Sequence, residues 1–186
     1  MKVIATSCYL LFALLLLPLT ACQQTYVVKG TTDAASFKGR QVALKIPTCD
    51  GTWTAVDSCQ VTHGVFFMKG HVDTVALTTL FVDDVPVMPI FLESGILHVD
   101  ISSFSRRVLG TPLNNELYSF INKSNALQAR VTELGHTESQ MIMSGMGAEA
   151  VRHYVDSVYS VVADSMAKLV DDLDPVVRHF LTAASN

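Results

Sequence analysis

The sequence lacks the short motifs by which most enzymes are identified. Its single tryptophan, Trp53, has no C-x-x-C pair beside it, and no G-x-S-x-G serine motif occurs in the chain. The six histidines are scattered, and no group of Cys and His residues has the three or four ligands that a zinc site needs. We therefore predict no catalytic site, no metal site and no cofactor.

Charged residues are also scarce, and the acidic ones outnumber the basic ones. Charged residues make up 16% of the chain, with 13 Lys and Arg against 17 Asp and Glu. A body of this net charge argues against nucleic-acid binding and against electrostatic attachment to anionic lipid. After residue 21 no stretch reaches the roughly eighteen apolar residues that a membrane span needs, so we expect no membrane-spanning helix.

A leader occupies the beginning of the chain, MKVIATSCYLLFALLLLPLTAC. Lys2 gives it a positive start, residues 8–17 form an apolar run, and Pro18 then breaks the hydrophobic segment. The run has the length of a signal-peptide core and is too short to cross a bilayer comfortably. Residues 1–21 are therefore predicted to be a signal peptide.

The end of the leader, LTAC at residues 19–22, resembles the bacterial lipobox, in which an aliphatic residue and two small residues precede a cysteine. The resemblance implies cleavage between Ala21 and Cys22, a diacylglycerol on the Cys22 thiol, and acylation of the new amine. A thiolate is the nucleophile that such a thioether requires. An ordinary secretory signal with a chance cysteine and an uncleaved anchor are the alternatives.

The residues after the cysteine bear on the destination of the protein. Gln23-Gln24-Thr25 contains no acidic residue, whereas acidic residues at this place resemble a surface-export signal of Bacteroidetes lipoproteins. No aspartate follows Cys22 to resemble an inner-membrane retention signal. We therefore expect a lipoprotein of the cell envelope, held in the inner leaflet of the outer membrane with its body in the periplasm.

Residues 22–110 are predicted to form a β-rich domain. Turn signals recur about every ten residues, the spacing of an antiparallel sandwich or barrel. The stretch ALTTLFV is apolar on both faces, which predicts burial from two sides. The expected strands cover residues 25–30, 41–46, 53–61, 65–70, 75–82, 88–92, 96–101 and 104–109.

Residues 111–186 are predicted to be helical, as a connector or bundle, which makes the fold class α+β. Asn114 or Asn115 is expected to cap a helix that runs to about Leu134, and GHTESQ is expected to interrupt it. A second helix is expected from about Gly147 to Leu173, because apolar residues recur there at three- and four-residue spacing. Pro175 should begin a last, short helix.

The β-rich stretch resembles a known domain family. VVKG, QVALKI, AVDSCQVTHGVFFMKGHV, PIFLESGILHVDI and VLGTPLNNEL follow one another between Val27 and about Leu117. In this order they resemble the β-rich domain of unknown function at the N-terminus of Bacteroidetes thioredoxin-like lipoproteins. In the longer relatives a helical connector and a thioredoxin domain with a W-C-x-x-C site follow. Here the chain stops at Asn186 without that site, as a free-standing or a truncated form of the module.

The cysteines outside the leader leave two alternatives open. Cys49 and Cys59 either form a disulfide, in a compartment that permits one, or remain two free thiols. If TCDG is a tight turn, Cys59 lies well up its strand, near the partner of Val42, and the Cα atoms then lie too far apart for a bond.

Other histidines and acidic residues could suggest a metal site or acid–base chemistry, but a structural interpretation is simpler for each. His63 with His71, Asp83 with Asp84, His153 with Asp156, and the acids Asp171, Asp172 and Asp174 are each expected to be turn, terminus or surface residues. Three aromatic residues either line a ligand surface or belong to the core: Tyr26, Trp53 and Phe104.

Two hypotheses on function follow. The first is a lipid-anchored envelope protein whose β-rich domain binds a partner or ligand without catalysis. The second, implied by the family resemblance, is an accessory module of a thiol–disulfide system that acts beside a separate thioredoxin-like protein.

Overall fold

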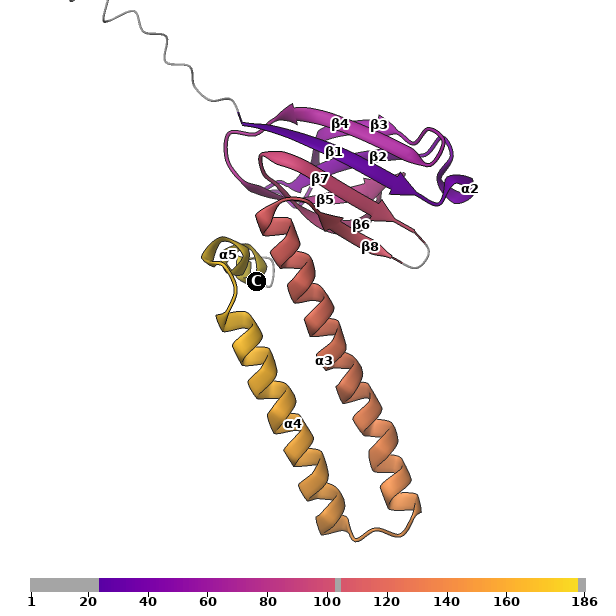
Figure 1. Cartoon of the computed structure of the whole chain (residues 1–186), viewed down its shortest axis with the longest axis vertical. Coiled ribbons are helices and arrows are strands. Elements are labelled where there is room, and N and C mark those ends of the chain that lie inside the picture. Colours follow the sequence, from indigo (N-terminus) through magenta and orange to yellow (C-terminus); the bar gives the residue numbers. More distant parts are fainter. Residues whose placement is uncertain (1–23, 103–104, 184–186) are drawn as a thin grey trace, which may run out of the picture.

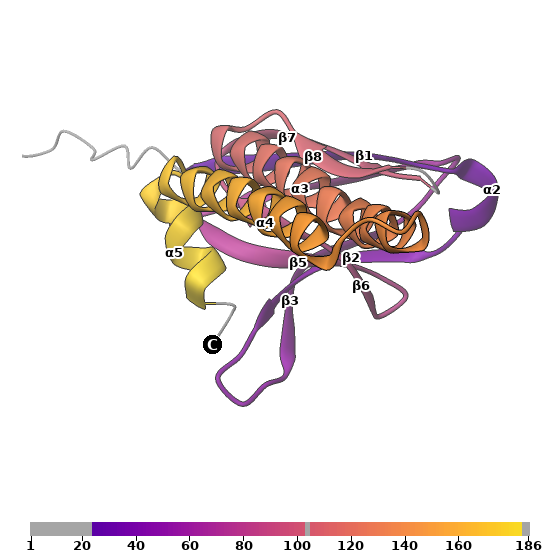
Figure 2. The ribbon, with the colours of Figure 1, turned by 90° about the horizontal axis from the view of Figure 1, so that it is seen from below.

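The computed structural model describes residues 24–102 and 105–183, and its β-rich part is a sandwich of two four-stranded sheets (Figures 1 and 2). Sheet A has the order β4-β1-β7-β8 and sheet B the order β3-β2-β5-β6. Their bounds are β1 Thr25–Thr32, β2 Gln41–Pro47, β3 Trp53–Gln60, β4 Val65–His71, β5 Ala76–Val82, β6 Val85–Leu92, β7 Gly95–Ile101 and β8 Arg106–Leu109. All eight predicted strands are confirmed, although the ladder between β1 and β7 is parallel.

The core lies between the sheets and follows the alternation of the strands. On β1 the side chains of Tyr26 and Val28 are buried, whereas Lys29 between Val28 and Gly30 is exposed. The other sheet contributes Leu44, Leu80 and Ile90, all fully buried. Apolar burial of this kind is the main source of stability for a sandwich.

Two-sided burial of β5 is confirmed. Leu80 faces the core, and the neighbouring Phe81 is 4% exposed although it points to the other face of sheet B. The Trp53 ring covers it edge-on at 5.0 Å, and Lys45 Nζ lies 4.7 Å from the ring centre. The exposed Trp53 therefore acts as a partial lid for the outer side of sheet B.

The predicted end of the first strand is wrong for an identifiable reason. Strand β1 does not end at Gly30 but continues to Thr32. The Phe66 ring lies over Gly30, so a side chain does not fit there, and a Cβ would approach the ring to 2.0 Å. Asp83 and Asp84 lie in a turn, as expected. They form the two-residue turn between β5 and β6 with φ of 47° and 64°, the left-handed values of a type I′ hairpin.

The C-terminal part has three helices beside the short α2 (Ala34–Phe37): α3 (Pro112–Met143), α4 (Ala148–Asp171) and α5 (Pro175–Ala183). The α3–α4 hairpin projects from the sandwich, and α5 folds back beneath it (Figure 1). On α5, Val177 is fully buried and Phe180 packs edge-on against Phe91 at 5.4 Å. The helical segment thus shares the core of the β-domain.

The predicted interruption of α3 is wrong, since the helix runs through GHTESQ to Met143. A glycine inside a helix destabilises it by about 1 kcal/mol relative to alanine, which weakens the helix without breaking it. Leu134 is buried there between the helices, and Val151 and Val162 are buried on α4. The second helix and the start of the third at Pro175 are confirmed.

Thr111, and neither asparagine, occupies the N-cap of α3. Asn114 is instead fully buried, where its Oδ1 accepts from the Phe91 backbone N–H at 2.9 Å and its Nδ2 donates to the Phe91 carbonyl at 2.7 Å. The Glu93 carboxylate accepts from the backbone N–H groups of Leu113 and Asn114. The Asn114 side chain thus supplies hydrogen-bond partners for the edge strand β6, and the Glu93 carboxylate caps the start of α3.

Within the described residues no helix is both long and apolar enough to cross a membrane.

Candidate functional site

The lipobox residues Ala21 and Cys22 lie outside the described residues, as does Phe104. Of the other aromatic candidates, Tyr26 belongs to the core and Trp53 covers Phe81 on sheet B. Among residues 24–102 and 105–183 no group of three or more His, Cys, Asp or Glu could hold a metal ion.

The two cysteines lie far apart along the β2–β3 hairpin, and both are free thiols. Cys49 is exposed in the turn, whereas Cys59 stands opposite Val42 near the other end of the ladder, as the hairpin length predicts. Burial raises the pKa of the Cys59 thiol, and the nearby Asp57 charge acts in the same direction. A raised pKa makes the thiolate scarcer at neutral pH, so Cys59 is not an activated nucleophile.

Three of the acidic candidates have structural partners, whereas Asp171 and Asp172 are exposed at the end of α4. Asp84 forms an ion pair with Lys45 at 2.6 Å and Asp83 one with Arg40 at 3.4 Å, which fastens the β5–β6 turn. Asp174 accepts from the Val176 backbone N–H at 2.7 Å and so caps α5. His153 and Asp156 are exposed on α4, and His63 and His71 lie at the two ends of β4. These groups do not meet in one place.

A different feature stands out, the outer face of sheet A. Large apolar side chains point away from the core here, with Phe67 56% exposed, Val65 53%, Ile96 45% and Leu109 40%. No helix of the described chain lies over this face, since α3 and α4 leave from the end of the sheet (Figures 1 and 2). Exposed apolar residues gathered on one uncovered face mark a binding surface more often than scattered ones do.

Cations alternate with these apolar residues because of the strand register. Lys29 on β1 stands opposite Phe67 on β4, and Val27 stands opposite Lys69, which gives a checkerboard across two strands. His98 on β7 lies beside Lys29 on its other side. Lysine stems can lie along neighbouring apolar surface while their ammonium groups stay in water. The face therefore offers apolar contact and positive charge at the same points.

A shallow groove of about 520 Å³ crosses the same face and runs to the edge of the sandwich. Its walls include Lys29, Thr31, Phe67 and His98 from sheet A, and Cys59 from the end of β3. The groove is open, and its walls are mainly apolar. It can hold part of a ligand or a chain segment, and it contains no activated nucleophile or acid–base pair.

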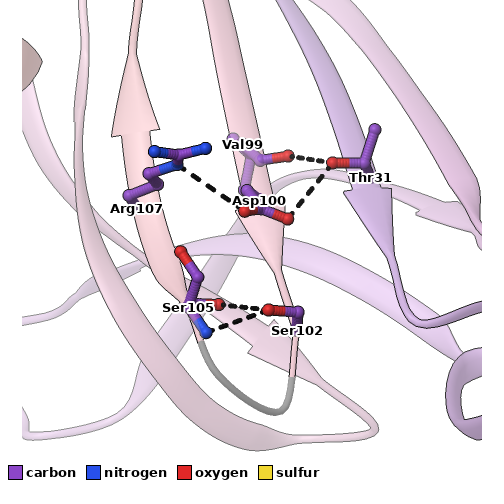
Figure 3. A network of polar contacts seen from close by, with 6 residues as sticks. All are labelled: Thr31, Val99, Asp100, Ser102, Ser105 and Arg107. Atoms are coloured by element: carbon purple, nitrogen blue, oxygen red, sulfur yellow. Dashed lines mark hydrogen bonds and ion pairs between the residues drawn. The ribbon is translucent and has the colours of Figure 1, made fainter.

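A polar network lies on this face at the end of β1 opposite to Thr25 (Figure 3). Asp100 lies 3.6 Å from Arg107 Nε, and the Thr31 hydroxyl lies 3.4 Å from both the Asp100 carboxylate and the Val99 carbonyl. The one acidic side chain that points outward from the described strands of this sheet is thereby balanced by an arginine. Lys29 and Lys69 form no ion pair among the described residues, so the face is net positive.

Sequence reasoning did not single out this surface, although a signal was present. VVKG and FFMKG each place an apolar residue and a lysine two positions apart, and thus on one side of a strand. Only the pairing of β1 with β4 brings the two motifs together.

Comparison with known proteins places the same stretch in a family. Residues 26–117 match the model of a family described as Domain of unknown function (DUF4369). No curated protein and no solved structure matches the chain. The match runs from the second residue of β1 to Leu117 on α3 and covers both sheets. The resemblance to a β-rich domain of unknown function is therefore confirmed, and the β-sandwich of this chain belongs to that family.

Proposed function

We propose that this protein is a lipid-anchored component of the bacterial cell envelope whose sandwich binds, without catalysis, through the outer face of sheet A. The observation that carries the proposal is the uncovered checkerboard of Val27, Phe67, Lys29 and Lys69. The lipobox-like LTAC sequence supports the anchor. We place the anchor in the inner leaflet of the outer membrane, with the body in the periplasm, because Gln23-Gln24-Thr25 contains no acidic residue.

The anchor is tested by metabolic labelling with an alkyne fatty acid. Wild-type protein should take up the label, and Cys22→Ser should lose it and accumulate as the uncleaved precursor. A wild-type chain that takes up no label contradicts the anchor.

The binding face is tested by thiol accessibility in isolated envelopes. In a Cys49→Ser, Cys59→Ser background, Phe67→Cys places a thiol on the face and Thr54→Cys places one on the exposed strand β3 of the other sheet. The Phe67→Cys thiol should react slowly with a water-soluble maleimide until detergent releases the protein, whereas the Thr54→Cys thiol should react quickly throughout. Equal reactivity of the two positions in envelopes contradicts the proposal.

The accessory role in a thiol–disulfide system rests on the family resemblance. Burial raises the pKa of Cys59, and Cys49 lies at the other end of the hairpin, so the described part of the chain has no attacking and resolving thiol side by side. The mature chain should therefore not reduce insulin disulfides. Turnover that disappears in a Cys49→Ser, Cys59→Ser variant would favour the redox role instead.

A further inference from the structure

We propose that the outer face of sheet A lies on the anionic phospholipid surface of the membrane that carries the chain's own lipid. This inference rests on the proposed function, because it takes the anchor at Cys22 as given and names the partner of the face described above. Three observations lead to it: the length of the tether, the distribution of charge and the position of the apolar side chains.

The tether between lipid and sandwich is very short. From Cys22 to Thr25, the first residue of β1, an extended chain spans at most about 11 Å. The Gln24 carbonyl already accepts from the Val72 backbone N–H at 2.9 Å, which fixes the chain one residue earlier. The headgroup layer of one leaflet is itself roughly 5–7 Å thick. The sandwich therefore cannot stand clear of the membrane and must present some surface to the headgroups.

Charge decides which surface that is. The chain as a whole has more Asp and Glu than Lys and Arg, so most of its surface is repelled by anionic lipid. The outer face of sheet A reverses this balance with Lys29, Lys69 and Arg107 against Asp100 alone among its described outward residues. Net charge alone argues against attachment to anionic lipid, and the arrangement of the strands overrides that argument locally.

The apolar side chains lie where a headgroup layer would receive them. Thr25 begins β1 at one end of sheet A, and the row nearest to it contains Val27, Ile96 and Lys69. The next row contains Phe67, Lys29, His98 and Leu109. The loop at the same end exposes Asp73 and Thr74, which supply neither apolar contact nor positive charge, and a single apolar residue, Val75, at 36%. The face is thus the surface within reach of the tether that suits an anionic membrane.

The test attaches the mature chain, residues 22–186, to vesicles that contain phosphatidylglycerol. Cys49→Ser and Cys59→Ser leave Cys22 as the sole thiol, which is coupled to a maleimide phospholipid. Trp53→Phe with Phe67→Trp then moves the only indole onto the face. Brominated phospholipids should quench this indole strongly, and its emission should shift to the blue. In the chain that keeps Trp53, the indole lies on sheet B and should be quenched no more than in solution.

A second measurement tests the charge. The untethered chain should bind phosphatidylglycerol vesicles, and Lys29→Glu with Lys69→Glu should lower the partition coefficient by more than about tenfold. Lys123→Glu with Lys168→Glu changes the net charge equally on exposed positions of α3 and α4, and should have a much smaller effect. Equal losses in the two pairs contradict the proposal. Circular dichroism and the melting temperature establish that each variant is folded.

The outcomes separate this inference from the proposed function. If bromolipid does not quench the indole but the Phe67→Cys thiol is protected in envelopes, the face binds a protein or a second copy of the chain, and the membrane inference is wrong while the binding role stands. If neither quenching nor protection is found, both are wrong.

Discussion

At the scale of single residues, Asn114 connects the two parts of the molecule. Its amide pairs with both backbone groups of Phe91 in the way that a neighbouring strand would, and its Nδ2 also lies 2.9 Å from the Thr111 hydroxyl. The side chain belongs to the first turn of α3, so the helix is fixed to the end of β6 by directional bonds as well as by packing. Buried bonds of this kind are most costly when one partner is removed.

We predict that Asn114→Ala lowers the free energy of unfolding by about 3 kcal/mol, because the Phe91 N–H and carbonyl lose their partner while they remain buried. Asn122→Ala, at an exposed position of the same helix, should change it by less than about 0.5 kcal/mol. Urea unfolding of the three proteins measures the difference. Equal stabilities would show that α3 is held to the sandwich by packing alone.

Tyr26 makes the sandwich less stable as the pH becomes alkaline. Burial, and then the hydrogen bond to Asp57 at 3.0 Å, raise its pKa from 10.0 to about 12. The unfolded chain therefore releases this proton at lower pH than the folded protein does. The stabilisation is complete below pH 10 and is lost as the pH rises from 10 towards 12. Burial raises the pKa of Tyr118 too, so a second residue acts in the same direction.

Between pH 9 and pH 12 the melting temperature of Tyr26→Phe should fall less than that of the wild type. The variant lacks one phenol whose pKa is raised in the folded protein. The control Tyr159→Phe removes an exposed phenol on α4 and should leave the alkaline decline unchanged. Differential scanning fluorimetry at a series of pH values provides the comparison. Identical declines for the wild type and Tyr26→Phe would contradict this assignment.

At the scale of elements, the α3–α4 hairpin differs from the sandwich in how it is held. Near the sheets, Leu117 and Tyr118 join the main core, whereas farther along α3 the buried apolar residue is Leu134, which faces α4. At the tip, Ile142 and Met143 are 59% and 79% exposed. A two-helix element with one apolar seam should open locally before the rest of the molecule unfolds.

Leu134→Ala should therefore destabilise the outer part of the hairpin, by roughly 3 kcal/mol for a buried leucine, and leave the sheets intact. Native-state hydrogen exchange followed by mass spectrometry should show faster exchange in peptides around Leu134 and Val151–Val162. Peptides from β1 and β7 should keep their wild-type rates. A uniform increase across both parts would instead mean that the hairpin and the sandwich unfold as one unit.

The sequence predicts the elements that depend on local pattern, and it fails where distant pairing decides. Turn spacing identifies the strands, the apolar residues on both faces of β5 predict its two-sided burial, and the spacing on α4 identifies its seam. The continuation of α3 through Gly135 depends on packing against a helix that comes later in the chain. The binding face depends on the register that sets Lys29 opposite Phe67, and a single strand does not reveal that register.

At the scale of the whole molecule, two exposed apolar regions of the described chain lie far apart. One is the outer face of sheet A, close to the beginning of β1 and therefore to the proposed anchor. The other is the tip of the α3–α4 hairpin, at the opposite end of the molecule (Figure 1). The two regions differ in charge, because lysines accompany the apolar residues on the sheet, while the tip sequence MIMSGMG has no charged residue. They need not have the same partner.

Hydroxyl-radical footprinting of the acylated protein in isolated envelopes tests whether the molecule is engaged through the outer face of sheet A. We predict that oxidation of Val65, Phe67 and Ile96 falls several-fold relative to the detergent-solubilised protein. Met143 and Met146, exposed at the hairpin tip, should be oxidised to the same extent in both. Unchanged oxidation of the sheet A residues, with protection at the hairpin tip instead, would show that the molecule is engaged through the helices and not through sheet A.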